Sequence, residues 1–453
     1  MRRLVTILVF TFFLFLVAAL SFLLVFKFEG RPPVLLGGKV PDLVGRKAEI
    51  VLKIGDNRSG LRGVKVFLTQ KERQKLLFEK EYPIDPLWGS RIKEDIIRLS
   101  FEPLKWGFKD GSAELIVQIW DASWRNGLKG NVFLARKKLT LDLTPPRVVV
   151  LSPMHYLIPG GSNLVVYRLG EPTKKQGIRL DTLFFKGYPL KDHPGVFLSF
   201  IALPVDKRTI SRLVVEAEDL AGNVTKMPVA YYIRHKRYRH DTIVISDGFL
   251  QQKMPEFLDR YEEIPKGDLL KAFLWVNTEL RRRNNEEISR ITRYSKVNRF
   301  YLTGAMLRLP HSATRALFGD QRTYYYHRRK IGTARHLGID LASVAGAPVP
   351  AAEAGKVVFA DYLGIYGNTV IIDHGYGLFS LYAHLAGFNI SVGDEVKRGQ
   401  LLGYTDTTGL AGGDHLHFAV LVQGVFVEPQ EWFDPQWVKT RIFEKLKKLG
   451  FKP

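Results

Sequence analysis

The feature that most constrains this chain is an uncharged run of 23 residues near its N-terminus, Leu4 to Phe26, which Lys27 ends. As a helix this run would be about 34 Å long, enough to cross the roughly 30 Å hydrocarbon core of a bilayer. A cleavable signal peptide is the alternative, but its apolar region usually has only about 7–15 residues and ends in an Ala-x-Ala-like site, which is absent here. We therefore predict an uncleaved transmembrane anchor over residues 1–28.

Composition narrows the chemistry and the partners. The 453 residues include no cysteine, which excludes disulfides, Cys-ligated zinc, iron–sulfur clusters and thiol nucleophiles. A metal ion would have to be held by His, Asp or Glu. The formal net charge of +22 favours a polyanionic partner, such as nucleic acid, anionic lipid or an acidic wall polymer, without choosing among them.

Residues 31–240 are predicted to form two antiparallel β-sandwiches. Short β-branched and aromatic runs alternate there with turn signals; the clearest are Ala48–Ile54, Val64–Leu68, Ile96–Phe101 and Ala113–Trp120. The turn that begins at Asp121 is repeated 98 residues later at Asp219-Leu220-Ala221-Gly222-Asn223, a spacing of about one immunoglobulin-sized unit. We expect Ig-like modules at 31–144 and 145–240, the second of which resembles bacterial Ig-like repeats.

A helical pattern follows over residues 241–300, which we interpret as a linker region. Its apolar residues are spaced for one helical face between Leu269 and Leu280, after a predicted start at Pro265. The basic residues Arg281–Arg283, Arg290, Arg293 and Lys296 form either a solvated helix side or a contact with anionic lipid or wall polymer. The run Thr323–Lys330 that follows is explained equally well by an edge strand and by a sugar- or phosphate-binding surface.

The residues with catalytic potential lie further along, in a segment of opposite charge. Residues 331–435 hold four basic and eleven acidic residues, a net charge of −7, and five of the eleven histidines. On an extended strand His336 and Asp340 would share a face, with Gly338 between them where a side chain would obstruct an ion. His415 and His417 would share a face in the same way. The two motifs offer a carboxylate and two imidazoles, and three protein ligands with an open position are typical of a catalytic zinc.

The same segment resembles the lysostaphin/LytM-type zinc peptidases that cleave peptidoglycan. The resemblance covers about a quarter of the chain in family order. Its motifs are His336–Ala342, Gly346–Ala351, Gly355–Val357, Tyr366–Val370, His374-Gly375, Leu381–Leu385, Val392–Val396, Gly399–Gly403 and His415–Phe418. It departs from the family at Gly412-Gly413-Asp414, where a Thr-Gly-Pro-like turn is usual, and at Ala419, where Glu is frequent. Asp414 either raises the basicity of His415 or faces solvent.

The resemblance implies zinc ligands and catalytic residues at named positions. It assigns zinc to His336, Asp340 and His417, and catalytic roles to His384 and His415, without saying which imidazole is the general base. His374 is expected to be structural. The implied fold is a compact, mostly antiparallel β domain with a groove over the metal, which we place at 301–440 and follow with a basic tail at 441–453.

We therefore expect a multi-domain, mainly β protein: a zinc metalloendopeptidase that hydrolyses peptidoglycan cross-links. It would be a single-pass protein of the bacterial cytoplasmic membrane, with its N-terminus inside and most of the chain in the periplasm or facing the wall. Its expected partners are peptidoglycan stem peptides and the membrane, with cell-division or wall-synthesis proteins as candidates and no nucleic acid. The alternatives are a non-catalytic LytM-like regulator that activates a partner hydrolase, and an adhesin built on the Ig-like modules.

Overall fold

The computed structural model describes residues 2–86, 88–297 and 299–451, and it shows a mainly β protein with two compact units. The first unit comprises Met1–Pro146 and Glu218–Val224, and the second comprises Arg147–Ala217 and Thr225–Pro453. Met1 of the predicted anchor and residues 452–453 of the predicted tail lie outside the described residues. The assignment of residue ranges to domains stays a prediction.

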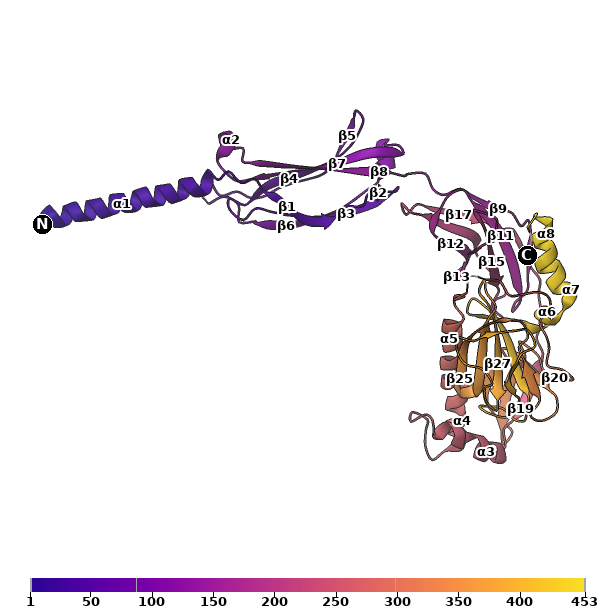
Figure 1. The fold of residues 1–453 in the computed structure, drawn as a ribbon. Coiled ribbons are helices and arrows are strands. Elements are labelled where there is room, and N and C mark those ends of the chain that lie inside the picture. The colour runs from indigo at the N-terminus through magenta and orange to yellow at the C-terminus, as the bar shows by residue number, and fades with distance from the viewer. Residues whose placement is uncertain (1, 87, 298, 452–453) are drawn as a thin grey trace. The chain divides into compact units, whose positions relative to one another are not determined.

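Helix α1 (Arg2–Lys27) contains the uncharged run (Figure 1). Its residues Arg3–Lys27 are long and apolar enough to cross a membrane, a criterion that a signal sequence also meets. Its large apolar side chains are exposed, from Leu4 at 68% to Val25 at 70%. A helix with exposed apolar residues on every side is not packed against a protein core, and lipid is a suitable environment for it.

Two sheets build the rest of the first unit. One has the order β1-β3-β6 and the other the order β2-β8-β7-β4-β5. Their bounds are β1 Val34–Lys39, β2 Leu43–Val44, β3 Ala48–Gly55, β4 Leu61–Gln70, β5 Arg73–Glu81, β6 Glu94–Phe101, β7 Gly111–Asp121 and β8 Val132–Leu141. Alternate residues of both sheets, such as Ile50 and Leu52 of β3 and Val64 and Val66 of β4, enter one buried cluster. The four strands predicted from alternation in this unit are confirmed as β3, β4, β6 and β7.

The two copies of the repeated turn share one aspartate–asparagine pair of hydrogen bonds. Asp121 accepts hydrogen bonds from the backbone and side-chain amide groups of Asn131, and Asp219 accepts the equivalent bonds from Asn223. Both aspartates are buried at the end of a strand, β7 and β16 (Leu213–Asp219). The shared feature is a buried aspartate that satisfies an asparagine where a strand ends. The loops differ in length, since the asparagine follows its aspartate by 4 residues in the second copy and by 10 in the first, where Asn126 bonds Gly130 instead.

The second unit begins with two four-stranded sheets and a short parallel pair. The sheet orders are β14-β15-β11-β9 and β13-β12-β16-β17, and β10 pairs with β18. The remaining bounds are β9 Val148–Val150, β10 His155–Leu157, β11 Ser162–Leu169, β12 Thr173–Leu180, β13 Leu183–Lys186, β14 Tyr188–Pro189, β15 Val196–Ala202, β17 Val224–Pro228 and β18 Tyr231–Ile233. The buried residues of these strands belong to the same hydrophobic cluster as residues of the last domain, such as Val420 and Trp432.

Helices α3 (Asp247–Leu258), α4 (Leu269–Trp275) and α5 (Arg281–Ile291) occupy the region predicted to be helical, and a π-helical turn, Val276–Leu280, joins the last two. Helix α4 begins after Asp268, whose side chain accepts a hydrogen bond from the Lys271 amide, so the start predicted at Pro265 is wrong by one turn. The helices pack against the last domain, because Phe257, Phe273 and Ile288 are buried with strand residues of that domain.

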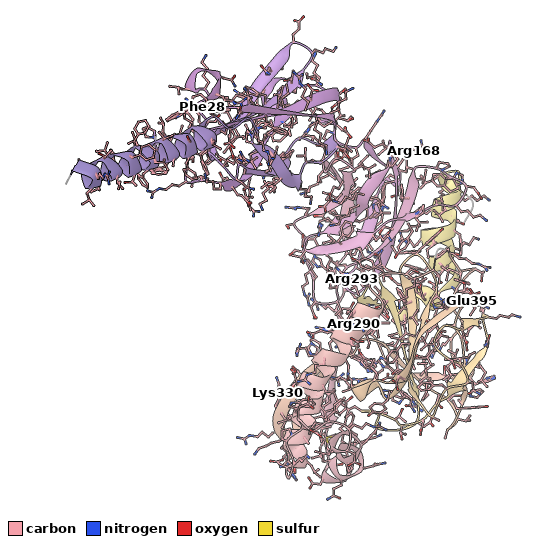
Figure 2. The ribbon with its side chains drawn as sticks, turned by 60° about the vertical axis from the view of Figure 1, so that its left-hand side comes forward. Phe28, Arg168, Arg290, Arg293, Lys330 and Glu395 are labelled. Atoms are coloured by element: carbon pink, nitrogen blue, oxygen red, sulfur yellow. The ribbon has the colours of Figure 1, made fainter. Side chains whose placement is uncertain are left out.

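The basic residues of α5 are paired within the helical region. Arg282 bonds Glu279 and Glu286, and Arg290, labelled in Figure 2, bonds Glu287. Such i,i+3 and i,i+4 pairs are typical of an exposed helix side. This arrangement favours the solvated side over a polyanion-binding face.

A large antiparallel sheet forms the centre of the last domain (Figure 1). Its order is β20-β23-β30-β27-β26-β25-β28, with β31 paired to β30. A second sheet has the order β19-β21-β22, and β24 pairs with β29. The bounds are β19 His240–Val244, β20 Ala313–Ala316, β21 Gln321–Tyr326, β22 Arg329–Arg335, β23 Ile339–Ala342, β24 Pro348–Pro350, β25 Gly355–Tyr362, β26 Asn368–Asp373, β27 Leu378–Leu385, β28 Glu395–Val396, β29 Leu401–Tyr404, β30 Leu416–Val422 and β31 Val425–Val427. Thr323–Lys330 therefore belongs to the β21–β22 hairpin. Most of its residues lie in strands, but of these two strands only β22 is at the edge of the sheet, because β21 lies between β19 and β22.

Short helices follow β31 and pack onto this core. They are α6 (Pro429–Phe433), α7 (Pro435–Val438), a π-helical turn (Lys439–Phe443) and α8 (Glu444–Lys448). Ile442, Leu446 and Phe451 are buried, so the segment that the sequence assigns to a basic tail contributes apolar side chains to the core. Glu431 of α6 accepts hydrogen bonds from the amide and hydroxyl groups of Ser162.

Glu431 predicts a pH dependence of stability. Burial, with the charge of Glu428, raises the pKa of Glu431 from 4.5 to about 7. Between these values the folded state binds more protons than the unfolded state, so stability falls as pH rises from about 4.5 to 7. We expect Glu431→Gln, which still accepts from Ser162, to flatten this decline and to stabilise the protein at pH 7.5 by on the order of 1–2 kcal/mol. Urea unfolding midpoints at pH 4.5–7.5 measure the effect, and parallel curves for both proteins would contradict it.

Candidate metal centre

Three neighbouring strands bring the acidic and imidazole side chains together. Asp340 of β23 lies directly opposite His417 of β30, and His417 lies opposite Ala383 of β27 on its other side. His384 is the next residue of β27. The strand register places the Asp340 and His417 side chains on one face of the sheet. Alternation would turn His384 to the other face, but its left-handed backbone, with a φ of 61°, interrupts the strand and brings the ring to the same side. All three side chains are buried.

His336 reaches these side chains from outside the strands. It lies in the bend between β22 and β23, so the expectation that His336 and Asp340 share one extended strand is wrong. His336 donates from Nδ1 to the Leu317 carbonyl oxygen at 2.9 Å, which leaves the lone pair of Nε2 facing Asp340. The His336 ring still lies beside Asp340, as expected, but the bent connection between the strands places it there.

His336, Asp340 and His417 form a tight cluster of ligand atoms. His336 Nε2 and His417 Nδ1 each lie 2.9 Å from Asp340 Oδ1, and 3.0 Å from each other. Ligands about 2.0–2.1 Å from a tetrahedral zinc lie about 3.3 Å apart, so only a small expansion would admit the ion. The chemistry also fits, since two imidazoles and one carboxylate are a known zinc ligand set. These residues could hold a metal ion.

Gly338 leaves the space that this cluster needs. A Cβ atom at Gly338 would lie 2.5 Å from His417 Nε2 and 2.6 Å from the Phe418 carbonyl oxygen. The Phe418 carbonyl oxygen belongs to the backbone of β30, a central strand, so moving it would disrupt the sheet. This close approach agrees with the sequence argument that a side chain at 338 would obstruct the site.

We expect Gly338→Ala to weaken zinc binding by about 10- to 100-fold, the range for changes that misorient metal ligands. The added methyl group would push the His417 ring out of the cluster. Competition with a chromophoric chelator measures the affinity. Gly248→Ala is a matched control, because a Cβ at Gly248 meets no atom within 4 Å. Equal affinities for the two variants would contradict this account of Gly338.

His384 and His415 line the same site without joining the cluster. Their ring centroids are 4.9 Å apart, and His384 is 5.9 Å from the His417 ring. His384 donates from Nδ1 to the Thr408 carbonyl oxygen, and His415 donates from Nδ1 to that of Gly413. The neutral form of each ring therefore has its lone pair on Nε2. His415 Nε2 lies 3.5 Å from Asp340 Oδ1, toward which it can donate when the ring is protonated.

The two imidazoles differ in environment. Burial, with the charges of His415 and His417, lowers the pKa of His384 well below its ordinary value. Burial also acts to lower the pKa of His415, but the hydrogen bond and charge of Asp340 outweigh it and raise the pKa. Asp414, the residue before His415, accepts hydrogen bonds from the Gly346 amide group and the Thr405 hydroxyl group. His384 further has a φ of 61°, a left-handed conformation that costs of order 1–3 kcal/mol in a non-glycine residue and is typical of functional sites.

Arg322 is a site residue that the sequence analysis missed. From β21, its Nη2 donates to Asp340 Oδ2 at 2.8 Å, while Oδ1 faces the two histidines. A charged guanidinium thus fixes the orientation of the carboxylate. The available signal was only that Arg322 immediately precedes the aromatic and basic run Thr323–Lys330.

A cavity of about 450 Å³ opens at the cluster. His336, Asp340, His384, His415 and His417 all line it, so the structure brings the five sequence-predicted residues together. One wall comes from upstream of the zinc-peptidase motifs: Ile243, Val244, Ile245, Ser246, Phe249, Phe273 and Arg281. The helical region 241–300 is therefore part of the site's surroundings.

His374 does not line this cavity. It is fully buried, donates from Nδ1 to the Ala354 carbonyl oxygen and shares a hydrogen bond between Nε2 and the Ser380 hydroxyl group. Burial lowers its pKa from 6.5 to about 4, so it is a neutral ring near pH 7. These contacts fit the expected structural role.

Comparison with known proteins places the site in a family. Residues 334–429 match the family Peptidase family M23. The DD-carboxypeptidase/endopeptidase Mpg of Neisseria meningitidis serogroup B is 40% identical over 94 residues, which are 21% of this chain and 22% of that protein. The murein hydrolase activator EnvC of Escherichia coli K12 is 35% identical over 107 residues, 24% of this chain and 26% of that protein.

Among solved structures, one from Pseudomonas aeruginosa described as a peptidase M23 aligns with 61% of this chain and 94% of its own, at 22% identity and a TM-score of 0.39. The sequence matches to Mpg and EnvC span about a quarter of those relatives' length, so they concern one domain and not the whole protein. That domain contains all five histidine and aspartate residues of the site. The C-terminal region of this chain is a peptidase family M23 domain of the LytM type.

Proposed function

We propose that this protein is a membrane-anchored, zinc-dependent endopeptidase that hydrolyses peptide cross-links of peptidoglycan. The observation that carries the proposal is the cluster of His336, Asp340 and His417, with His384 and His415 at the same cavity. Two further points support it: each position to which the family resemblance assigns a ligand or catalytic role holds the expected residue, and curated relatives include DD-endopeptidases such as ShyA of Vibrio cholerae.

In this proposal His336 binds zinc through Nε2, His417 through Nδ1 and Asp340 through Oδ1. The Nδ1–H donation of His336 to Leu317 fixes the tautomer that leaves Nε2 free to ligate. Arg322 holds the other oxygen of Asp340. Zinc bound there would polarise the scissile carbonyl group and lower the pKa of a coordinated water toward about 7.

The two remaining imidazoles supply proton transfer. Each holds its Nδ1 proton on a backbone carbonyl oxygen, so Nε2 can accept a proton from the attacking water and later return one to the leaving amine. The other imidazole, when protonated at Nε2, can donate a hydrogen bond to the oxyanion.

The rest of the chain suits a wall-facing enzyme. Helix α1 would cross the cytoplasmic membrane with the N-terminus inside, because peptidoglycan lies outside. The β-sandwich regions before the M23 domain would be Ig-like modules that separate it from the bilayer. Cell-division or wall-synthesis proteins are candidate partners for these modules, and the compartment leaves no role for nucleic acid.

A second candidate function is activation of another wall hydrolase. The observation that favours it is the wall of the cavity, where Phe249 and Phe273 from upstream helices approach the cluster. Apolar residues of this kind can make a site suitable for binding a peptide. The murein hydrolase activator EnvC is also among the relatives. The complete set of ligand residues favours the enzyme.

The test is mass spectrometry of fragments released from purified peptidoglycan by the detergent-solubilised protein. Three samples are compared: zinc-loaded, chelated, and chelated with zinc restored. We expect cross-linked muropeptide dimers to become monomers in the first and third samples only. No release by the zinc-loaded protein, together with release when a wall amidase is added, would support the activator instead.

A further inference from the structure

A second cluster of carboxylates lies in the first unit, far along the chain from the M23 motifs. Glu29, Asp56 and Asp121 each present one oxygen, and these oxygens lie within 4.8 Å of one another. The residues are 3%, 7% and 0% exposed. Three buried negative charges repel one another strongly, so the arrangement needs a compensating positive charge or protons.

Most of the carboxylate oxygens already accept hydrogen bonds. Asp121 accepts from the Ser123 amide and from Asn131, and Asp56 accepts from the Arg58 amide and the Ser59 hydroxyl group. Glu29 Oε1 accepts from the Ser59 amide. These bonds hold the three side chains in fixed orientations while leaving further lone pairs on the oxygens.

Glu29 Oε2 is the exception. It is buried and has no hydrogen-bond partner. Arg58 Nε lies 3.7 Å away, too far for a hydrogen bond, on a side chain that is 44% exposed. An unbonded buried carboxylate oxygen is costly, and here it belongs to the cluster of three carboxylates.

The positive charges beside the cluster include the half-exposed Arg58, which forms a 3.7 Å ion pair with Glu29 Oε2, and Lys27. The nearby Lys27 ammonium group is buried, but it is directed to the Ala122 carbonyl oxygen at 3.5 Å. Burial, with the charges of Asp56 and Asp121, raises the pKa of Glu29. The repeated turn offers a comparison, because Asp219 has the same bonds to Asn223 but no such group of three acidic residues within the described part of the chain.

We propose that Glu29, Asp56 and Asp121 form a binding site for a divalent cation, with Ca²⁺ as the best match. All ligands are carboxylate oxygens, which Ca²⁺ and Mg²⁺ prefer to nitrogen ligands. Oxygens at 2.3–2.6 Å around Ca²⁺ can lie up to about 5 Å apart, which accommodates this spread. Mg²⁺ is a smaller ion with shorter metal–oxygen distances, and it requires nearly ideal octahedral coordination.

The site joins three separate parts of the unit. Glu29 lies just after α1, Asp56 follows β3 of one sheet and Asp121 ends β7 of the other. Phe28, labelled in Figure 2, lies where α1 meets the strands, and its carbonyl oxygen accepts from Arg125. The carbonyl oxygens of Lys27 and Glu29 accept from Trp124 and Asn131. A bound cation would therefore hold the residues that follow α1 against one strand of each sheet.

Calorimetric titration of the full chain in detergent tests the site, after a chelator has removed all divalent cations and has itself been removed, and one equivalent of zinc has been restored. Keeping zinc in place prevents Ca²⁺ from being measured at the histidine cluster. We expect one Ca²⁺ per chain, and a loss of affinity of about 10-fold or more in Glu29→Gln. Glu49→Gln, which changes an exposed glutamate, is the control. No binding to the wild type, or equal binding to Glu29→Gln, would overturn the proposal.

Thermal unfolding gives a second readout that a purely structural cluster would not produce. In chelator, Glu29→Gln should unfold at a higher temperature than the wild type, because it removes one of three repelling charges. In excess Ca²⁺ the order should reverse. Asp56→Asn provides the same comparison should Glu29→Gln not fold. An order of stability that is the same with and without Ca²⁺ would show that protons, and not a cation, neutralise the cluster.

Discussion

His417→Ala is expected to abolish zinc binding and peptidoglycan hydrolysis together. His417 lies between β23 and β27, and it supplies one of the two imidazoles of the cluster. Loss of the metal removes several kcal/mol of transition-state stabilisation, so we expect hydrolysis to fall by at least about 10³-fold. Metal content by plasma mass spectrometry and release of muropeptide monomers measure the two effects.

The control for this variant is His235→Ala, which changes an exposed histidine in the loop before β19. It should retain full zinc content and activity. Circular dichroism shows whether the His417→Ala protein is folded, since the side chain is buried and its loss leaves a small cavity. A folded His417→Ala protein that still hydrolyses peptidoglycan would contradict the assignment.

His384→Ala is expected to separate metal binding from catalysis. The His384 ring lies beside the cluster, and its Nδ1 is bonded to Thr408 outside the cluster. Removal of a general acid–base group costs typically about 10²- to 10⁴-fold in rate. We therefore expect zinc content within about twofold of the wild type, with turnover lower by that factor.

Steady-state hydrolysis of a soluble cross-linked muropeptide measures the effect of His384→Ala, with the fall expected in kcat. His415→Ala should behave alike, because its ring also lies outside the three-residue cluster. His327→Ala, in the exposed turn of the β21–β22 hairpin, is the matched control. Loss of zinc from His384→Ala would instead make His384 a ligand or a support of the cluster.

The sequence predicted five residues that the structure brings to one cavity, because their motifs lie on or next to strands that pair in the sheet. Asp340 and His417 are direct neighbours across β23 and β30, and His384 is one residue beyond their register on β27. The geometric argument for His336 was nevertheless wrong in its detail. A local pattern cannot show that the backbone bends before Asp340, because contacts made elsewhere, such as the bond to Leu317, hold that bend.

Other features depended on contacts between distant segments. Arg322 acts on Asp340 from a separate sheet, and nothing in its local sequence distinguishes it from other arginines. The cavity wall from Phe249 and Phe273 arises because the helices pack onto the last domain. Glu29, Asp56 and Asp121 are far apart in sequence and form no motif, so only the fold could bring them together.

The most direct test of the central claim is to locate zinc in crystals of the protein by anomalous scattering above and below the zinc absorption edge. The account predicts one strong peak bounded by His336 Nε2, Asp340 Oδ1 and His417 Nδ1. It also predicts that His384 and His415 face the ion without binding it. A peak at other residues, or none in crystals of zinc-loaded protein, would contradict the proposed metal centre.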